Sequence, residues 1–442
     1  MSRSLSFEYD AVDQPAAVDP VERATWCALR IRVGDRSISR VYDRTLQSER
    51  TTLYVPAFPI AEWLVHNWWI FRNEPCRTEK VPAPHELGTQ LGWIKRHCLR
   101  AADSALMLPS LYLYHDGREL RAVWQPDEPG TMPNMLGQFV SWGDEPLDDV
   151  STCESLGNFI GETLDRVSKL DDGRVRELRL NWQAIQVADR EEQEFCAITG
   201  RMGIDPYDRE ALTDEVAEFL EAINPTEKPI VRDLTEVATT TSVIGQWSWV
   251  HEVSMELGLT PTTVVVPVGL PHPGSSPPRF GYSLARTVRD HVQLPPALRI
   301  DSVEAIAMSA TERPFRVVER NHVEGAAIRA IVGQSGHEIV SAGPMPVRNE
   351  SRRFLIARSL YHAIVTTVQG VRLVTNAFTW HQKASRAFAA ELLAPQGALL
   401  ARLEDGAAAN PDVIEQMSKD FEVSAMVIEK QLENAGAAIV RE

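Results

Sequence analysis

The sequence lacks the features that mark membrane-spanning and disulfide-stabilised proteins. Its 442 residues contain no apolar stretch near the roughly 18 residues that suggest a transmembrane helix. The N-terminal segment holds acidic side chains and no apolar run, which argues against a secretory signal. The five cysteines are odd in number and include no CxxC pair, which favours reduced thiols over a disulfide framework or a thiolate zinc site. They are Cys27, Cys76, Cys98, Cys153 and Cys196. We therefore expect a soluble, cytoplasmic protein with no membrane partner.

Positive charge is also scarce. Lys and Arg number 45 against 61 Asp and Glu, and the formal net charge of −16 repels phosphate backbones. No dense run of basic residues offers a local patch, so nucleic acid is a poor candidate partner. The sequence also lacks a GxxxxGK[ST] phosphate loop and a GxSxG nucleophile elbow. These absences argue against a P-loop nucleotidase and a serine hydrolase.

The length and an ordinary content of 44% hydrophobic and 24% charged residues predict a globular chain of two or three domains. Residues 1–20 are polar and contain proline, so we expect a loose segment there. Alternating apolar residues around Gly34 and around Gly117 predict two β-hairpins. Between them lies a helix whose large aromatic residues we expect to anchor a core. They are Trp63, Trp68 and Trp69. Residues 21–148 are therefore predicted as a mixed α+β N-terminal domain.

The next two segments are expected to separate that domain from the last one. Over residues 149–258, four stretches carry apolar residues at helical spacing, which predicts a helical middle domain. Residues 259–278 are rich in Pro and Gly, which disfavour both helix and strand, so we expect a linker. With a final domain over 279–442, the fold class is predicted as α+β and mostly helical.

Three segments of the last domain stand in a distinctive order. The first, residues 351–365, begins with Arg352, Arg353 and Phe354 and is expected to be a core-packed helix. The second, residues 379–395, consists of strong helix formers and stops at Pro395. The third, residues 414–437, is expected to form two short helices around Val423 and Ser424.

That order resembles the ImmA/IrrE family of bacterial zinc metallopeptidases, whose peptidase domain is zincin-like. In that family an Arg-rich, Phe-containing lead runs into an AHELGH helix, and a helix of the type ExxANxFAAELLxP follows. Here Phe388 to Leu393 and Pro395 match the second helix, and Phe421, Val423 and Ser424 match the turn between the last two helices. The resemblance covers residues 279–442. It implies a zincin-like fold and proteolysis of helix-turn-helix repressors in stress response, mobile-element control or phage defence.

The departures from the family motif fall on its metal site. An HExxH helix needs two His at i and i+4 as zinc ligands and a Glu as the general base. Arg358 stands at the first His position, Ser359 stands at the Glu position, and only the second ligand, His362, remains. Tyr361 lies inside the altered motif, and Gln382 stands where the family has its third ligand, a Glu, with His381 one residue before it.

Two interpretations of His362 remain open at this point. It can be a retained metal ligand, together with His381 and a distant residue such as His337 or His322. It can instead be a hydrogen-bonded core histidine in an inactive site, since Arg358 would place a fixed positive charge beside a dication. A sharper hypothesis follows, in which the Arg358 guanidinium takes the place of the metal and bonds the polar groups of the second helix.

Three functions compete on these grounds. The first is a regulatory or sensor protein with an inactive peptidase site (a pseudo-peptidase) that binds a protein partner or peptide segment and holds no cofactor. The second is an active metallo-endopeptidase with a rearranged zinc site at His362 and His381. The third, a helix-turn-helix transcriptional regulator, rests on the rhythm of residues 414–437. Against it, residues 404–442 hold nine acidic and three basic side chains.

Overall fold

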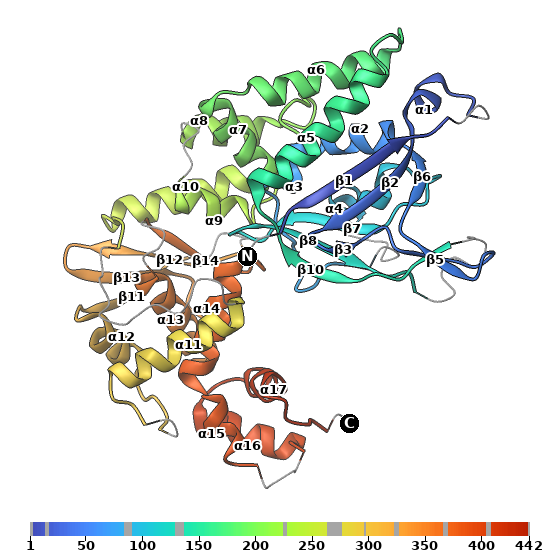
Figure 1. The fold of residues 1–442 in the computed structure, drawn as a ribbon. Helices are drawn as coiled ribbons and strands as arrows, with labels where there is room; N and C mark the ends of the chain where they lie inside the picture. Colours follow the sequence, from blue (N-terminus) through green and yellow to red (C-terminus); the bar gives the residue numbers. More distant parts are fainter. Residues whose placement is uncertain are drawn as a thin grey trace. The chain divides into compact units, whose positions relative to one another are not determined.

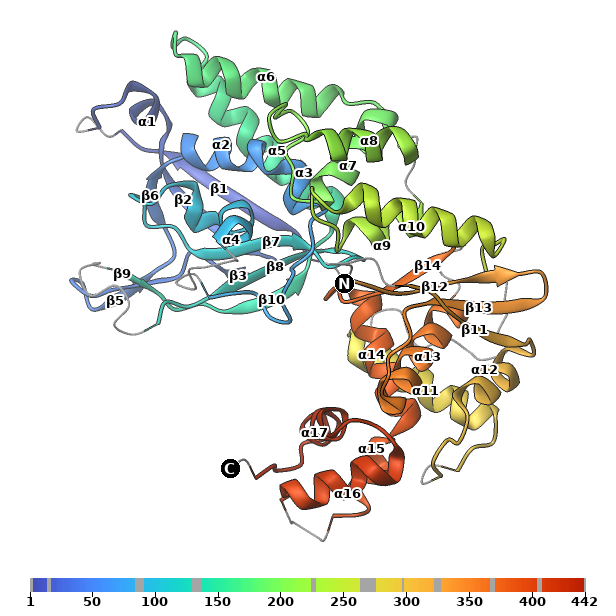
Figure 2. The same cartoon turned by 180° about the vertical axis from the view of Figure 1, so that it is seen from behind.

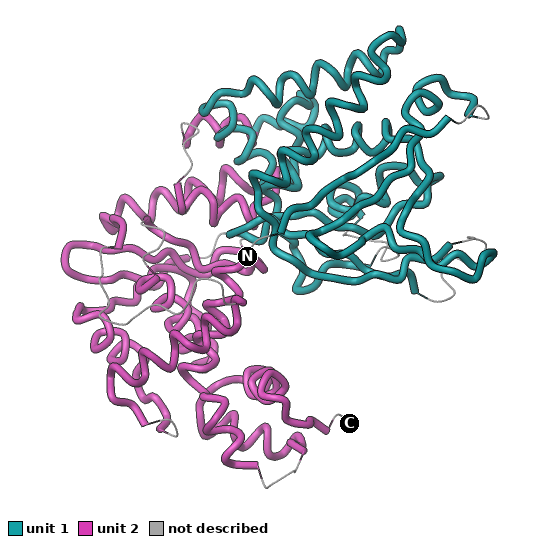
Figure 3. Tube along the Cα trace, in the orientation of Figure 1, with its two compact units in different colours: residues 1–214, 224–226 teal, residues 215–223, 227–442 magenta. Residues whose placement is uncertain are grey.

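The computed structural model describes residues 3–13, 17–83, 91–128, 137–223, 228–262, 276–295, 298–321, 327–365, 370–403 and 408–440. The chain has a mixed α+β structure, as predicted, and divides into two compact units (Figure 3). Unit 1 comprises residues 1–214 and 224–226, and unit 2 comprises residues 215–223 and 227–442. Within the described ranges, no helix combines the length and the apolar character that crossing a bilayer requires.

The described residues of unit 1 form three small sheets with helices (Figure 1). One sheet has the order β1-β2-β3 with β6 also paired to β2, the second has the order β10-β8-β7, and the third has the order β5-β4-β9. Its elements are β1 (Leu5–Ala11), α1 (Pro20–Thr25), β2 (Trp26–Val33), β3 (Arg36–Ser37), β4 (Val41–Asp43), β5 (Ser48–Arg50), β6 (Leu53–Pro56), α2 (Phe58–His66), α3 (Trp68–Phe71), α4 (Leu91–His97), the 3-10 helix η1 (Leu99–Ala102), β7 (Ser110–His115), β8 (Leu120–Gln125), β9 (Gly137–Phe139), β10 (Gly143–Pro146), α5 (Asp149–Arg166), α6 (Gly173–Val187) and α7 (Arg190–Arg201).

Both predicted hairpins are present in unit 1. Gly34 joins β2 to β3 with a φ of 53°, and Gly117 joins β7 to β8 with a φ of 91°. Positive φ angles of this size favour glycine, which has no Cβ to clash with the backbone. The three Trp of α2 and α3 are buried, as expected for a core anchor.

The N-terminal segment is more ordered than the sequence suggested. We expected residues 1–20 to be loose, but Leu5–Ala11 form β1, which pairs with β2 along its whole length. Leu5 and Phe7 point into the core, because alternate residues of a strand face the same side of the sheet. Glu8 and Asp10 are exposed and Ser6 is only partly buried, and these polar residues make the segment look unstructured in sequence.

The helices of the expected middle segment divide between the two units. In unit 1, α5 lies along β1 (Figure 2), and the Phe159 ring meets the Phe7 ring edge-on at 5.2 Å. In unit 2, α9 (Pro229–Thr235) packs against β14 (Arg372–Thr375). The boundary at residue 214 thus differs from the predicted middle domain over 149–258. Each helix follows the partner that buries its apolar face, and local periodicity does not identify that partner.

Unit 2 contains a four-stranded sheet of order β11-β13-β12-β14. The β11–β13 pair is parallel, the other two pairs are antiparallel, and β14 is an edge strand. The remaining elements are α8 (Asp214–Ile223), α10 (Val243–Glu256), α11 (Pro277–His291), α12 (Val303–Thr311), β11 (Phe315–Glu319), β12 (Ile328–Ser335), β13 (Glu338–Gly343), α13 (Asn349–Ile364), α14 (Trp380–Leu393), α15 (Gln396–Leu400), α16 (Pro411–Phe421) and α17 (Ala425–Asn434).

The three helical segments predicted for the last domain are α13, α14 and the α16–α17 pair. α13 packs against the strands β12 and β14 and lies beside α14, which also crosses α11 (Figure 1). A Cβ at Gly281 of α11 would lie 2.3 Å from the carbonyl oxygen of Ala384, so the crossing requires glycine there. Of the predicted linker, residues 263–275 lie outside the described residues, and α11 begins at Pro277.

Candidate functional site

The altered motif and the second helix of the resemblance meet in unit 2. Arg358 and His362 lie one turn apart on α13, and Gln382 lies in the first half of α14. All three side chains are buried, with relative exposures of 6% for Arg358, 2% for His362 and 0% for Gln382. The structure therefore brings together residues 24 positions apart in sequence that were expected to share a site.

The Arg358 guanidinium points into this cluster and away from solvent. Its Nη2 donates to Gln382 Oε1 at 2.7 Å and to the Thr375 carbonyl oxygen at 2.8 Å. Its Nε donates to Ser385 Oγ at 3.1 Å. Gln382 and Ser385 both belong to α14, so the guanidinium bonds the polar groups of the second helix, as hypothesised from the sequence.

The Gln382 amide completes the free edge of β14. Its Nε2 donates to the Leu373 carbonyl oxygen at 2.8 Å, and its Oε1 accepts from the Thr375 amide at 3.0 Å. The side chain thus pairs with the strand edge as a neighbouring peptide group would. An ionised Glu has no N–H to donate and would leave the Leu373 oxygen unpaired.

An ion pair from α9 covers the rest of that edge. Asp233 accepts from Arg372 Nε at 2.7 Å, from Arg372 Nη2 at 2.9 Å and from the Leu373 amide at 2.9 Å. Burial alone would lower the pKa of Arg372, but the Asp233 carboxylate outweighs it and raises that pKa. Glu236, directly after α9, accepts from Thr379 Oγ1 at 2.9 Å. The edge of β14 that faces away from β12 is therefore covered by side chains.

His362 is a buried imidazole within this cluster. Neither of its ring nitrogens makes a hydrogen bond of normal geometry. Burial, followed by the charges of Arg372 and Arg358, lowers the pKa of His362 well below its usual value, while Gln382 acts weakly in the opposite direction. The neighbouring Tyr361 hydroxyl meets His381 Nδ1 at 3.1 Å. One interpretation from the sequence made His362 a hydrogen-bonded core histidine. The structure shows His362 in the core, but without the hydrogen bonds that this interpretation expected.

Ser359 is engaged on the sheet side of α13. It accepts a hydrogen bond from Ser341 Oγ at 2.8 Å and donates one to the Leu355 carbonyl oxygen at 3.0 Å. With a relative exposure of 0%, it has no access to solvent. The residue at the general-base position therefore takes part in packing between α13 and β13.

The residues present do not fit a zinc ion. No group of three or more His, Cys, Asp or Glu side chains that could hold a metal ion occurs in the described parts of the chain. His337, one of the distant ligands considered, lies exposed on the β12–β13 turn, and His322 lies outside the described residues. Arg358 and Arg372 place positive charge next to His362, which opposes binding of a dication.

A second buried charge cluster, in unit 1, was missed in the sequence. Glu74 receives two hydrogen bonds from Arg96, at 2.7 and 2.9 Å, and lies 2.9 Å from His97 Nε2. His97 Nδ1 lies 2.6 Å from the Leu113 carbonyl oxygen, so the ring satisfies both acceptors only when both nitrogens carry protons. No motif flags such a cluster, because these are common residue types and Glu74 lies 22 and 23 positions from Arg96 and His97.

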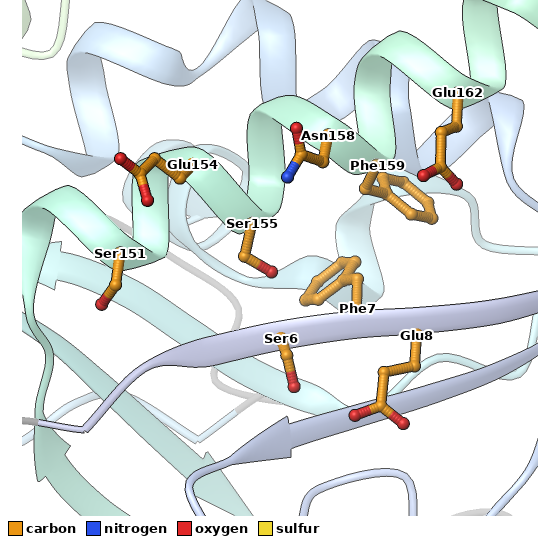
Figure 4. A pocket seen from close by; sticks show the side chains of 9 residues that line it. All are labelled: Ser6, Phe7, Glu8, Ser151, Glu154, Ser155, Asn158, Phe159 and Glu162. Carbon is orange, nitrogen blue, oxygen red and sulfur yellow. The ribbon is translucent and has the colours of Figure 1, made fainter.

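Unit 1 also has a shallow groove between β1 and α5 (Figure 4). Its volume is about 350 Å³, and the figure shows the polar side chains of α5 on one side of the Phe7 and Phe159 rings and Ser6 and Glu8 of β1 on the other. The lining residues are Ser6, Phe7, Glu8, Ser151, Glu154, Ser155, Asn158, Phe159 and Glu162. None of its carboxylates is buried enough to be held in a fixed position, so the groove has no built binding site.

Comparison with known proteins adds no assignment to this geometry. No family model matches the sequence, and no curated protein matches it either.

Proposed function

We propose that unit 2 is a pseudo-peptidase of the ImmA/IrrE type that works in the cytoplasm as a regulatory or sensor module. In this proposal its altered site binds a segment of a protein partner and holds no metal. The observation that carries it is the bond from Arg358 Nη2 to Gln382 Oε1, at 2.7 Å. It joins the positions of two of the three metal ligands in the resembled family.

The chemistry of the site supports a loss of proteolysis. Hydrolysis of a peptide by a zincin needs a Lewis acid and a base that takes a proton from the bound water. Ser359 is a very weak base and is fully engaged with Ser341 and Leu355. Arg358 cannot ligate a cation, because its guanidinium has no acceptor. The resemblance supplies the biological context of stress response, mobile elements or phage defence.

The test is the metal content of the full chain, purified without added zinc or chelator and measured by elemental mass spectrometry. We expect far less than one transition metal per chain and a melting temperature that a chelator does not change. A triple variant, R358H/S359E/Q382E, restores the expected ligands and base. It serves as a positive control for zinc uptake if circular dichroism shows that it folds.

The second candidate is an active metallo-endopeptidase with a rearranged site. It is favoured by the two unbonded ring nitrogens of His362 and by the closeness of His381, which bonds the adjacent Tyr361. This reading predicts near-stoichiometric zinc that is lost in H362A and in H381A. That result would overturn the pseudo-peptidase proposal, whereas unchanged, low metal content in both variants supports it.

A further inference from the structure

Three guanidinium groups from different elements converge on one tripeptide at the end of β14. Arg358 of α13 donates to the Thr375 carbonyl oxygen at 2.8 Å. Arg329 of β12 donates to Asn376 Oδ1 at 3.0 Å, and Arg386 of α14 donates to the Ala377 carbonyl oxygen at 2.8 Å. Residues 375–377 therefore fix three positive charges in one small region of unit 2.

The charge on Arg358 is not neutralised by the described part of the protein. Its acceptors there are a hydroxyl, a carbonyl and an amide oxygen, with no carboxylate among them. Burial, and then the charges of Arg386 and Arg329, lower the pKa of its guanidinium well below the usual value. Because arginine keeps its proton in proteins, this unfavourable interaction is retained as a cost to the folded state.

The three arginines differ in their exposure to solvent. Arg329 is exposed, Arg386 is half-buried, and Arg358 is buried. The planar guanidinium of Arg386 lies 5.2 Å from the centre of the Phe378 ring, which holds it in a fixed orientation. An anion could therefore reach the cluster from solvent and meet donors whose positions are already set.

We propose that Arg329, Arg358 and Arg386 form an oxyanion-binding site, which accepts a carboxylate or phosphate group of a bound ligand. The inference deepens the proposed function, since it gives the chemical class that the altered peptidase site recognises. Guanidinium groups bind carboxylates and phosphates through charge-assisted and often bidentate hydrogen bonds. A negative ligand also relieves the repulsion among the three cations and the cost of the buried charge. In a chain of net charge −16, such a cluster is local and can select anions that the rest of the surface repels.

The test is calorimetric titration of the full chain, in a sample whose metal content has been measured. The probes are inorganic phosphate and a short acetylated peptide, N-acetyl-triglycine, with either a free or an amidated C-terminus. We expect saturable binding of phosphate or of the free-acid peptide, and none of the amidated peptide. Binding of phosphate alone would identify a phosphate ligand. Binding of the free-acid peptide would identify a peptide carboxylate. Either result supports the site.

Variants at the two accessible arginines locate the binding. R329Q and R386Q should each weaken binding by about tenfold or more, because each removes a charged hydrogen bond. The matched control is R352Q, which removes an exposed arginine of α13 outside the cluster. No saturable binding of either probe, or an equal loss in R352Q, would overturn the site. If the sample proves metal-free but binds no anion, the oxyanion site fails while the pseudo-peptidase proposal stands.

Discussion

The two buried charge clusters of this protein differ in how their charges are matched. In unit 1 the Glu74 carboxylate is surrounded by cationic donors, and both nitrogens of His97 face acceptors. In unit 2 the Arg358 guanidinium has only neutral acceptors among the described residues, and both nitrogens of His362 lack hydrogen bonds of normal geometry. Glu74 and His97 are as deeply buried as Arg358 and His362, whereas Arg96 stays partly exposed, and the clusters also differ in charge complementarity.

This difference supports the proposal that the unit 1 cluster serves the fold and the unit 2 cluster a ligand. A buried ion whose partners are complete is expensive to break and resembles a structural element. A buried charge or polar atom without a complete set of partners lowers stability and is retained where a function compensates for it. Unit 2 also contains a matched pair, Asp233 with Arg372, next to the unmatched Arg358. The contrast therefore exists within a single unit as well.

The largest expected effect is the removal of the matched carboxylate in unit 1. E74A should lower the free energy of unfolding of unit 1 by about 3–5 kcal/mol, because it removes the buried carboxylate that accepts from Arg96 and lies against the fully buried His97 Nε2. The measurement is urea unfolding followed by tryptophan fluorescence, to which Trp93, stacked 4.3 Å from His97, contributes. The control is D171A, which removes a carboxylate that is 97% exposed and also pairs with an arginine. A similar, small loss in both variants would mean that charge matching in unit 1 contributes little.

The same cluster should make stability depend on pH in acid. Burial would raise the pKa of Glu74, but hydrogen bonds from His97 and Arg96 outweigh it and lower the pKa from 4.5 to about 2. A depressed carboxyl pKa stabilises the folded state above the unfolded value of 4.5, and this contribution disappears as the pH falls toward 2. The loss should approach about 3 kcal/mol. The measurement is chemical unfolding of unit 1 at a series of acidic pH values.

The control for the acid effect is E74Q, which cannot ionise at this position. Its free energy of unfolding should vary less with pH over the same window than that of the wild type. Parallel pH profiles for E74Q and the wild type would show that other carboxyl groups account for the acid sensitivity.

The sequence predicted those parts of the structure that depend on local pattern. The turns at Gly34 and Gly117 and the helices around Arg358 and Gln382 follow from spacing and residue type. The meeting of Arg358 with Gln382 was implied only by the resemblance, which gives both positions as metal ligands. The direction of the Arg358 side chain was hypothesised from the same resemblance, in which its position is a metal ligand facing the second helix, and its bonds to Gln382 and Ser385 agree with it. The three residues at the family's metal-ligand positions, Arg358, His362 and Gln382, could therefore be named before any contact between them was known.

The parts that could not be predicted depend on tertiary pairing. Nothing near Glu74 in sequence indicates that His97 will meet it, because α4 reaches it only through the packing of unit 1. The role of Gln382 as a partner for the edge of β14 needed the position of a strand of only four residues. Likewise, the first strand was missed because only Leu5 and Phe7 carry its buried pattern. The meeting of Arg329, Arg358 and Arg386 at residues 375–377 also depends on tertiary pairing and could not be predicted from the sequence.

The smallest expected stability effect is at the unmatched cation. R358M should change the free energy of unfolding of unit 2 by only about 1 kcal/mol, because the lost hydrogen bonds are offset by removal of a buried, unneutralised charge. The control is R372M in the same unit, which leaves Asp233 buried without its cation and should cost about 3–5 kcal/mol. Both are measured by urea unfolding, with oxyanion binding as a second readout, which R358M should weaken strongly. If R358M costs as much as R372M, the neutral acceptors satisfy Arg358 as fully as a carboxylate satisfies Arg372. The distinction between a structural and a ligand-binding cluster would then fail, and with it the reason for expecting an anion at this site.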